Sequence, residues 1–291
     1  MAYIFQGVGT ALITPMLDNK IDYISLEKLV KTQLDSGIAC LVANGTTGEP
    51  STISDEEKIK IASVVIEIVN KKIPVIVGAG SNSTEHAIRQ AIDAKSVGAD
   101  GLLCVTPYYN KCTQQGLIEH FKSIADQVDL PIIMYNVPSR TGLNMLPETV
   151  AKLAGYKGIC AIKEASGNIS QIMELACISG NDFFLYSGDD GLTYPILTLG
   201  GAGVISVASN VIPKYMHEMV DSYFTGNVEK SRNMQLRILP FIKALFLEVN
   251  PIPVKCAAKL LGICSDEVRL PLTKCTCESI LEKELKNLGL L

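Results

Sequence analysis

Short apolar runs rich in β-branched residues recur along the chain, and each run is bounded by Gly, Pro or Asn. The runs are continuously apolar rather than alternating, which is typical of strands in a parallel sheet that is covered on both faces. They predict eight strands, at residues 7–13, 38–43, 74–77, 101–105, 131–135, 158–163, 183–186 and 202–207.

Between these runs lie stretches in which apolar residues are spaced three and four apart, the pattern of an amphipathic helix. Ser54 is followed by Glu57 in the capping-box spacing, and Ser25 precedes another such stretch, so we expect helices to begin at both serines. The pattern is clear in four segments, residues 25–34, 54–69, 84–97 and 114–128.

Eight strand-then-helix units in a chain of 291 residues predict an α/β protein of the (β/α)8 or TIM-barrel type. A doubly wound open sheet is the alternative, although it usually needs fewer units. After the eighth strand the pattern predicts only helix, from about residue 213 to residue 291. We therefore expect a catalytic barrel at residues 1–224 and a C-terminal helical extension at 225–291, which would make oligomer contacts or pack beneath the barrel.

The charge balance of the chain excludes several kinds of partner. There are 26 basic and 30 acidic residues, a net charge of −4, and neither sign forms a long block. Nucleic-acid binding is not expected, because it needs clustered Lys and Arg. The N-terminus has no basic targeting region, and no apolar run reaches the roughly 18 residues of a membrane span, so we expect a cytoplasmic protein.

The nine cysteines are an odd number, and several lie inside the apolar runs, which indicates buried thiols in a reducing compartment. Cys275 and Cys277 form a C-x-C motif with Cys264 upstream, but no second pair or nearby His completes four zinc ligands. Asp189 and Asp190 could hold Mg²⁺, yet no further acids cluster with them, and they disfavour a phosphorylated substrate. We expect no metal.

Barrel enzymes carry their reacting groups at the carboxyl ends of the strands and in the loops that follow. Lys163 ends an apolar run, so we expect it to point into a dry barrel mouth. Loss of water disfavours the ammonium form and lowers the lysine pKa, which makes the amine a nucleophile toward carbonyl groups. The alternative is a structural lysine paired with Glu164 or Asp189, and position alone favours neither.

Tyr135 ends the neighbouring predicted strand and would reach the same cavity with a phenol that can carry protons. Imine formation needs proton transfer to and from a carbinolamine, whereas His86, His120 and His217 all fall in helical stretches. By itself, a tyrosine in this position is more often a core aromatic residue with its hydroxyl satisfied. Together, the lysine and the tyrosine favour a Schiff-base-forming aldolase that takes a 2-oxo acid.

Two further segments supply groups that bind carboxylates. The turn Gly45-Thr46-Thr47-Gly48 offers backbone N–H groups and two hydroxyls ahead of a predicted helix. Arg140 offers a planar guanidinium at the rim, suited to a bidentate carboxylate. Each signal is weak alone, because such turns are common and Arg140 could be an ordinary surface residue.

Longer motifs occur at the same strand ends: GTTGE (45–49), TPYYN (106–110), YNVPSRTG (135–142), IKEASGN (162–168), SGDD (187–190) and GVISVASN (203–210). With these motifs the chain resembles the dihydrodipicolinate synthase family. The likeness extends from FQGVGTALITP at 5–15 to NPIPVK at 250–255 and RLP at 269–271, and so covers essentially the whole chain.

The resemblance implies condensation of pyruvate with L-aspartate 4-semialdehyde to 4-hydroxy-tetrahydrodipicolinate, in diaminopimelate and lysine biosynthesis. It makes Lys163 the residue that forms the imine with pyruvate, and it implies no cofactor. Tyr135, Thr46 and Tyr109 match the family's proton relay, in which Tyr109 comes from the partner subunit of a tight dimer. We expect such dimers to pair into a homotetramer.

The resemblance also assigns the substrate-binding residues. Thr47 matches the residue that grips the pyruvate carboxylate, and Gly188 and the main chain of Ile205 line the same pocket. Arg140 matches the arginine that receives the carboxylate of the semialdehyde. The roles of Lys163, Tyr135, Thr47 and Arg140 therefore follow from the residues and from the resemblance alike, whereas Tyr109 has a role only through the resemblance.

Feedback regulation is expected to differ from that of regulated bacterial members, which bind lysine at the dimer interface with histidines and a glutamate. Asn82 and Tyr108 match those positions, but Asp55, Lys58 and His86 do not. We expect inhibition by lysine to be weak or absent.

Two other functions fit part of the pattern. A sister pyruvate-dependent aldolase, such as N-acetylneuraminate lyase or a 2-keto-3-deoxy sugar acid aldolase, shares the barrel, lysine and tyrosine. Arg140 argues against it, because a sugar-binding rim needs hydroxyl partners more than a fixed cation. A non-catalytic barrel that only binds ligands would be expected to lose at least one member of the set, and every member is present.

Overall fold

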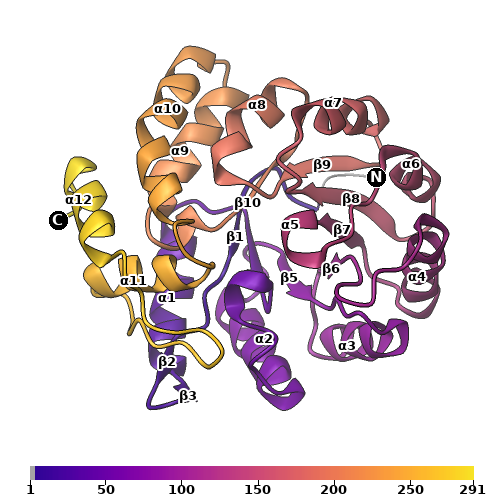
Figure 1. Cartoon of the computed structure of the whole chain (residues 1–291), viewed down its shortest axis with the longest axis horizontal. Coiled ribbons are helices and arrows are strands. Elements are labelled where there is room, and N and C mark those ends of the chain that lie inside the picture. Colours follow the sequence, from indigo (N-terminus) through magenta and orange to yellow (C-terminus); the bar gives the residue numbers. More distant parts are fainter. Residues whose placement is uncertain (1–3) are drawn as a thin grey trace.

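Eight parallel strands close into a barrel in the order β1-β10-β9-β8-β7-β6-β5-β4, as predicted (Figure 1). The computed structural model describes residues 4–291; residues 1–3, part of the N-terminus in which no targeting signal is expected, lie outside the described residues. The strands are β1 Gly7–Ala11, β4 Cys40–Ala43, β5 Val75–Gly78, β6 Gly101–Val105, β7 Ile132–Asn136, β8 Ile159–Glu164, β9 Phe184–Ser187 and β10 Gly203–Ser206.

Helices surround the barrel on the outside, which explains why the strands are apolar on both faces (Figure 1). Among residues 4–291, no helix is long and apolar enough to cross a membrane. A short helix, α5 (Pro138–Thr141), follows β7. A second helix, α6 (Pro147–Ala154), follows α5 before β8 begins. The helices that follow the other strands are α1 Tyr23–Asp35, α2 Asp55–Val69, α3 Thr84–Ser96, α4 Gln114–Gln127, α7 Ile169–Ile178, α8 Thr193–Thr198 and α9 Pro213–Phe224.

One of the two predicted helix starts is confirmed. Ser54 caps α2, its hydroxyl accepting from the backbone N–H of Glu57 while the Glu57 carboxylate accepts from the N–H of Ser54. The prediction for Ser25 is wrong, because α1 begins two residues earlier. Asp22 is its cap, and its carboxylate accepts from the N–H groups of Ile24 and Ser25 at 3.1 Å.

The C-terminal region contains α10 (Val228–Ala244), α11 (Ile252–Leu260) and α12 (Glu278–Asn287). The expectation of helix throughout is wrong for residues 261–277, which form turns and irregular chain. Gly262 lies in the left-handed region and Pro271 cannot donate a helical hydrogen bond, so this segment is a poor helix former. The boundary at residues 224/225 falls between α9 and α10 and stays a prediction.

Two short strands were not predicted. β2 (Met16–Leu17) and β3 (Lys20–Ile21) form an antiparallel hairpin between β1 and α1. Asp18 and Asn19 adopt positive φ at its turn, as short polar side chains tolerate. Four residues in two strands are too few for a hydrophobic pattern to reveal.

The barrel interior is filled by one hydrophobic cluster that draws alternate residues from the strands, including Val42, Ile76, Ile133, Tyr135 and Ile205. Side chains along a strand alternate between its faces, so residues two apart point the same way. Ala161 belongs to this cluster, and Lys163 two residues later in β8 therefore points inward. The alternation places the lysine at the mouth of the packed interior.

A fully buried ion pair joins the barrel to the C-terminal region. Lys255 in α11 donates to the Glu49 carboxylate at 2.7 Å, and both side chains are completely shielded from solvent. The backbone N–H of Arg269 donates to the other Glu49 oxygen at 3.3 Å, while its guanidinium binds Glu57 in a bidentate pair. The loop after β4 is thus held in place by α11 and the segment that follows it.

Replacement of Lys255 by Met should lower the free energy of unfolding by about 3–5 kcal/mol, because it leaves the Glu49 charge buried and unpaired. Urea unfolding monitored by circular dichroism measures the change. The matched control is Lys31→Met, which breaks an exposed pair with Glu27 and should cost less than about 0.5 kcal/mol. Adding Glu49→Leu to Lys255→Met should recover part of the loss; equal stability of Lys255→Met and the wild type would contradict the assignment.

Candidate active site

Lys163 lies inside the barrel mouth, only 5% exposed. It sits opposite Tyr135 in the register of β7 and β8, and its Nζ is 4.2 Å from the centroid of the Tyr135 ring. Burial lowers the pKa of Lys163 to about 8, while the charge of Asp190 acts in the opposite direction. The neutral fraction of the amine near physiological pH is therefore far larger than that of an ordinary lysine, as a nucleophile toward a carbonyl requires.

The carboxylates considered as structural partners of Lys163 are used elsewhere. Glu164 accepts from the Asn136 amide at 3.0 Å and from the backbone N–H of Ser166 at 2.5 Å. Asp189 accepts from the backbone N–H of Gly191 at 2.7 Å. These contacts give no support to the reading of Lys163 as one half of an ion pair.

Tyr135 is nearly as buried as the lysine, with 6% of its surface exposed. Burial raises the pKa of its phenol to about 12, while the charge of Arg140 and a hydrogen bond with the Thr46 side chain act in the opposite direction. Thr46 opens a single 3-10 turn, Thr46–Gly48, directly after β4. The turn thus places a hydroxyl against the tyrosine that faces the lysine.

Gly188 lies where no larger residue fits. A Cβ at this position would come within 3.0 Å of Lys163 Cε and 2.9 Å of the Ala165 Cβ, so the loop after β9 can pass over the lysine only as glycine. Its backbone N–H donates to the carbonyl of Glu164 at 2.8 Å. Ile205 in β10 is buried in the barrel interior, as its expected place in the pocket requires.

A cavity of about 860 Å³ opens above the barrel mouth, and its lining includes Thr46, Tyr109, Tyr135 and Arg140. The other four candidates, Lys163, Thr47, Gly188 and Ile205, lie outside this lining. The Lys163 amine is nonetheless 4.2 Å from the centroid of the Tyr135 ring, which belongs to the lining.

Tyr109 differs from the other candidates because 89% of its surface is exposed in the single chain. Its backbone is in the left-handed region, with φ +69°, which is rare for a bulky residue and persists only where the surrounding structure demands it. The following residue fixes the loop, since the Asn110 amide donates to the carbonyl of Asn82 at 2.9 Å. The loop therefore holds a large aromatic ring away from its own chain.

Asn250 is a site residue that the residue patterns did not identify, although the NPIPVK motif contains it. Its carbonyl accepts from the Arg140 guanidinium at 3.0 Å, and its amide donates to the Thr47 hydroxyl, also at 3.0 Å. It belongs to the connection between α10 and α11, far from both partners in sequence. One residue of the C-terminal region thus holds both expected carboxylate-binding residues, Arg140 through its backbone carbonyl and Thr47 through its side-chain amide.

Asp190 has a structural role that the sequence did not show. One of its carboxylate oxygens accepts from the backbone N–H groups of Val207 and Ala208 at 2.9 and 3.0 Å, which ties the loop after β9 to the loop after β10. Burial raises the pKa of this carboxyl. The group that was considered for Mg²⁺ is therefore an anchor between two loops of the site.

A closed (β/α)8 barrel with a dry lysine of lowered pKa beside a buried tyrosine has the arrangement of a class I aldolase. The profile of the Dihydrodipicolinate synthetase family matches residues 4–287. The 4-hydroxy-tetrahydrodipicolinate synthase of Acetivibrio thermocellus is 50% identical over 290 residues, 99% of each protein.

Solved structures agree with this result. The dihydrodipicolinate synthase of Thermotoga maritima superposes with a TM-score of 0.98 at 48% identity, covering 99% of this chain and all of the other. A monomeric dihydrodipicolinate synthase variant gives 0.97, also at 48% identity, and covers 99% of this chain and 98% of its own. The chain belongs to the dihydrodipicolinate synthetase family.

The lowered pKa of Lys163 predicts how its reactivity depends on pH. Acylation of this amine by a small anhydride should rise about tenfold per pH unit below pH 8 and level off above it, as the neutral amine becomes the main form. Mass spectrometry of digested protein after brief labelling at each pH measures the profile. In urea the midpoint should return toward the usual lysine value of about 10.4. A midpoint near that usual value in the folded chain would refute the assigned environment.

Proposed function

We propose that this chain condenses pyruvate with L-aspartate 4-semialdehyde to give 4-hydroxy-tetrahydrodipicolinate, in the cytoplasm. Relatives about 50% identical over nearly the whole chain are named 4-hydroxy-tetrahydrodipicolinate synthase. Cysteines that are free and mostly shielded fit a reducing compartment. The single observation that carries the proposal is the dry amine of Lys163 against the ring of Tyr135.

In the proposed reaction, the neutral Lys163 amine adds to the C2 carbonyl of pyruvate, and the carbinolamine loses water to form an imine. Loss of a C3 proton gives an enamine, whose C3 attacks the aldehyde carbon of the semialdehyde, and the new alkoxide takes up a proton. The amino group of the semialdehyde then attacks C2 and displaces the Lys163 nitrogen as the ring closes, which returns the free amine. Tyr135, whose ring lies against the amine, is assigned as the proton carrier, with the Thr46 hydroxyl bonded to it. A phenol whose pKa is raised to about 12 is a proton donor in its resting state and needs a partner to take the proton onward.

Two carboxylates have to be held, one from each substrate. Thr47, the backbone at Gly188 and the main chain of Ile205 are assigned to the carboxylate of pyruvate, close to Lys163. Arg140 is assigned to the carboxylate of the semialdehyde at the cavity rim. Asn250 supports both assignments, because it bonds to the Thr47 hydroxyl and the Arg140 guanidinium at once.

The two alternative functions are not favoured. The family match and the full-length relatives named 4-hydroxy-tetrahydrodipicolinate synthase argue against a sister aldolase, and Arg140 lines the cavity as a semialdehyde-binding residue would. A non-catalytic barrel has no need of a buried amine with a lowered pKa.

Arg140→Ala should lower kcat/KM for the semialdehyde by about ten- to a hundredfold, the cost of a charged hydrogen bond, while the KM for pyruvate stays nearly constant. Arg140→Lys keeps the charge but loses the bidentate geometry of the guanidinium, so its kcat/KM should lie between those of the wild type and Arg140→Ala. Steady-state assays with each substrate varied in turn give both constants. Equal kcat/KM in all three proteins would refute the role of Arg140; a wild-type chain that ignores the semialdehyde but cleaves sugar acids would refute the function.

We further propose that the active unit is a tight dimer in which Tyr109 completes the relay of the partner's site, and that dimers pair into a tetramer. The support is the exposed ring of Tyr109, held away from its own chain by a strained loop at the cavity. We retain the division into a barrel, residues 1–224, and a helical extension, residues 225–291.

Mixing two inactive variants tests the shared site. Tyr109→Phe and Lys163→Met chains should each be nearly inactive, yet equal mixtures refolded together should recover about a quarter of wild-type activity. Half of the random dimers are hybrids, and each hybrid has one site with an intact lysine and an intact tyrosine. Refolding each variant alone is the control, and a mixture no more active than its components would show that Tyr109 does not act across the interface.

A further inference from the structure

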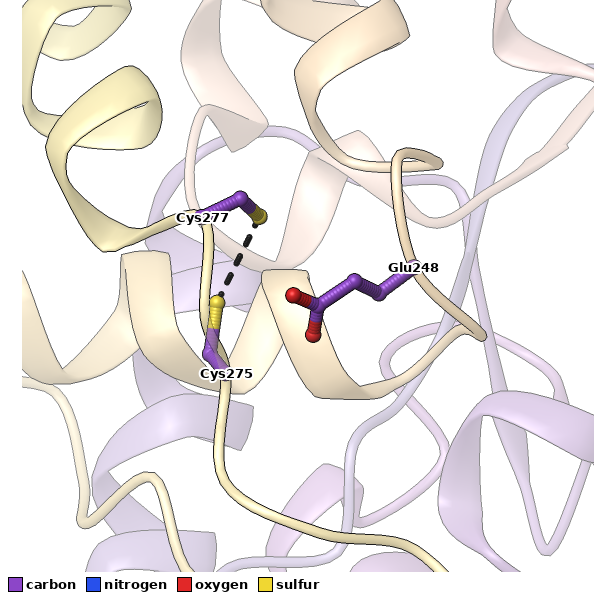
Figure 2. A group of neighbouring side chains, drawn as sticks. All are labelled: Glu248, Cys275 and Cys277. Atoms are coloured by element: carbon purple, nitrogen blue, oxygen red, sulfur yellow. Dashed lines mark hydrogen bonds between the residues drawn. The ribbon is translucent and has the colours of Figure 1, made fainter.

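Three thiols gather in the C-terminal region, away from the candidate active site. The sulfurs of Cys275 and Cys277 lie 3.5 Å apart, just before α12 (Figure 2). Cys256 in α11 lies near Cys275, and its thiol donates to the Glu278 carboxylate at 3.8 Å. The C-x-C motif that seemed incomplete in the sequence thus gains a third sulfur from a helix 19 residues earlier.

A carboxylate completes the group. Glu248, in the chain after α10, directs its side chain toward the two sulfurs, and the three possible ligand atoms all lie within 4.8 Å of one another (Figure 2). The backbone N–H of Thr276 donates to Glu248 at 2.9 Å, and the Thr276 hydroxyl bonds to the same oxygen. The residue between the two cysteines therefore fixes the carboxylate beside them, as supporting residues do around metal ligands.

We propose that this cluster is a binding site for Zn²⁺ or a similar thiophilic divalent cation, with Cys275, Cys277 and Glu248 as ligands and with Cys256, which lies outside this close group, moving in as the fourth. Zn²⁺ prefers four ligands of this kind in a tetrahedron, with Zn–S bonds of about 2.3 Å, which places two sulfurs about 3.8 Å apart. The distance between Cys275 and Cys277 is already close to this value. Cys275, Cys277 and Glu248 are already close together, whereas Cys256 would have to turn from Glu278 toward them.

A second group of possible ligands is less suitable. Cys256, Asp266 and Glu278 also lie within 4.8 Å of one another, but Lys259 forms ion pairs with both carboxylates, at 3.1 and 3.2 Å. The ammonium group of Lys259 thus already neutralises the two carboxylates. Glu248 accepts only from Thr276 among the contacts found in residues 4–291, so its charge remains available for an ion.

The surroundings of the thiols argue against a reactive, redox-active pair. Burial and the hydrogen bond with Cys275 raise the pKa of Cys277 to about 12. A thiol held in its protonated form is a poor nucleophile in disulfide exchange. A bound divalent cation would supply the positive charge that the cluster lacks and would release the thiol protons to solvent.

The position of the site indicates a structural role. An ion there would join the end of α10, the helix α11, the irregular segment 261–277 and the start of α12. Cys256 directly follows Lys255, which holds Glu49, and Glu248 lies two residues before Asn250, which holds Thr47 and Arg140. The ion would therefore fasten the segments that support the active site without touching substrate.

Cobalt serves as the spectroscopic probe, because Co²⁺ bound by thiolates absorbs through sulfur-to-metal charge transfer. The full-length chain, reduced with a phosphine and freed of metal by chelation, should bind one Co²⁺ with this absorption, and Zn²⁺ should displace it. Cys275→Ser and Cys277→Ser should each weaken the absorption and lower Zn²⁺ affinity by about tenfold or more. Glu248→Gln should weaken Zn²⁺ binding similarly but leave the charge-transfer band in place.

Cys177→Ser is the matched control, because Cys177 is an exposed thiol in α7, outside the cluster. It should bind Co²⁺ and Zn²⁺ as the wild type does. Added Zn²⁺ should also raise the melting temperature of the wild type and of Cys177→Ser but not of Cys275→Ser. Absence of the charge-transfer band in the reduced wild type, or its persistence unchanged in both cluster variants, would overturn the proposal whatever the enzymatic activity is.

Discussion

The parallel closure of the barrel is the constraint on which the candidate site depends. Because all eight strands run in one direction, their carboxyl ends meet at one mouth, and residues distant in sequence become neighbours there. The register of β7 and β8 sets Tyr135 opposite Lys163, and side-chain alternation turns both inward. The barrel interior is already filled by apolar side chains, so the lysine has no water at its base. Its lowered pKa is a consequence of this packing.

The C-terminal region helps to position the residues of the candidate site. The buried pair of Lys255 and Glu49 fixes the loop that carries the two threonines, and Asn250 joins Thr47 to Arg140. Burying both charges costs free energy of desolvation, but replacing only one partner costs more, because the other charge is then buried without a counter-ion. The pair is therefore sensitive to substitution. The proposed metal ligands lie on the same segments. Stability of the extension and geometry of the barrel mouth are therefore linked.

The sequence predicted the barrel because eight apolar runs have a period and spacing that few other folds share, and it predicted Lys163 because a charged residue at the end of such a run is unusual. It could not predict the contacts of Asn250, Lys255 and Cys256, because these join residues about 20 to more than 200 positions apart, and no local pattern encodes such a distance. The non-helical segment 261–277 was missed in part for the same reason. Gly262 and Pro271 make it a poor helix former, but the pairing of Arg269 with Glu57, which fixes the segment against α2, joins residues 212 positions apart. The start of α1 was misplaced because Asp22 and Ser25 are both good N-cap residues, and the local sequence does not decide which of them caps the helix.

The central claim is that Lys163 forms the imine with pyruvate. Incubation of the protein with pyruvate and borohydride, followed by intact mass measurement and peptide mapping, tests it most directly. The account predicts one reduced pyruvyl group per chain, located on Lys163, and none on a Lys163→Met chain treated in the same way. An unmodified mass for the wild type, or a pyruvyl group on another lysine, would contradict it.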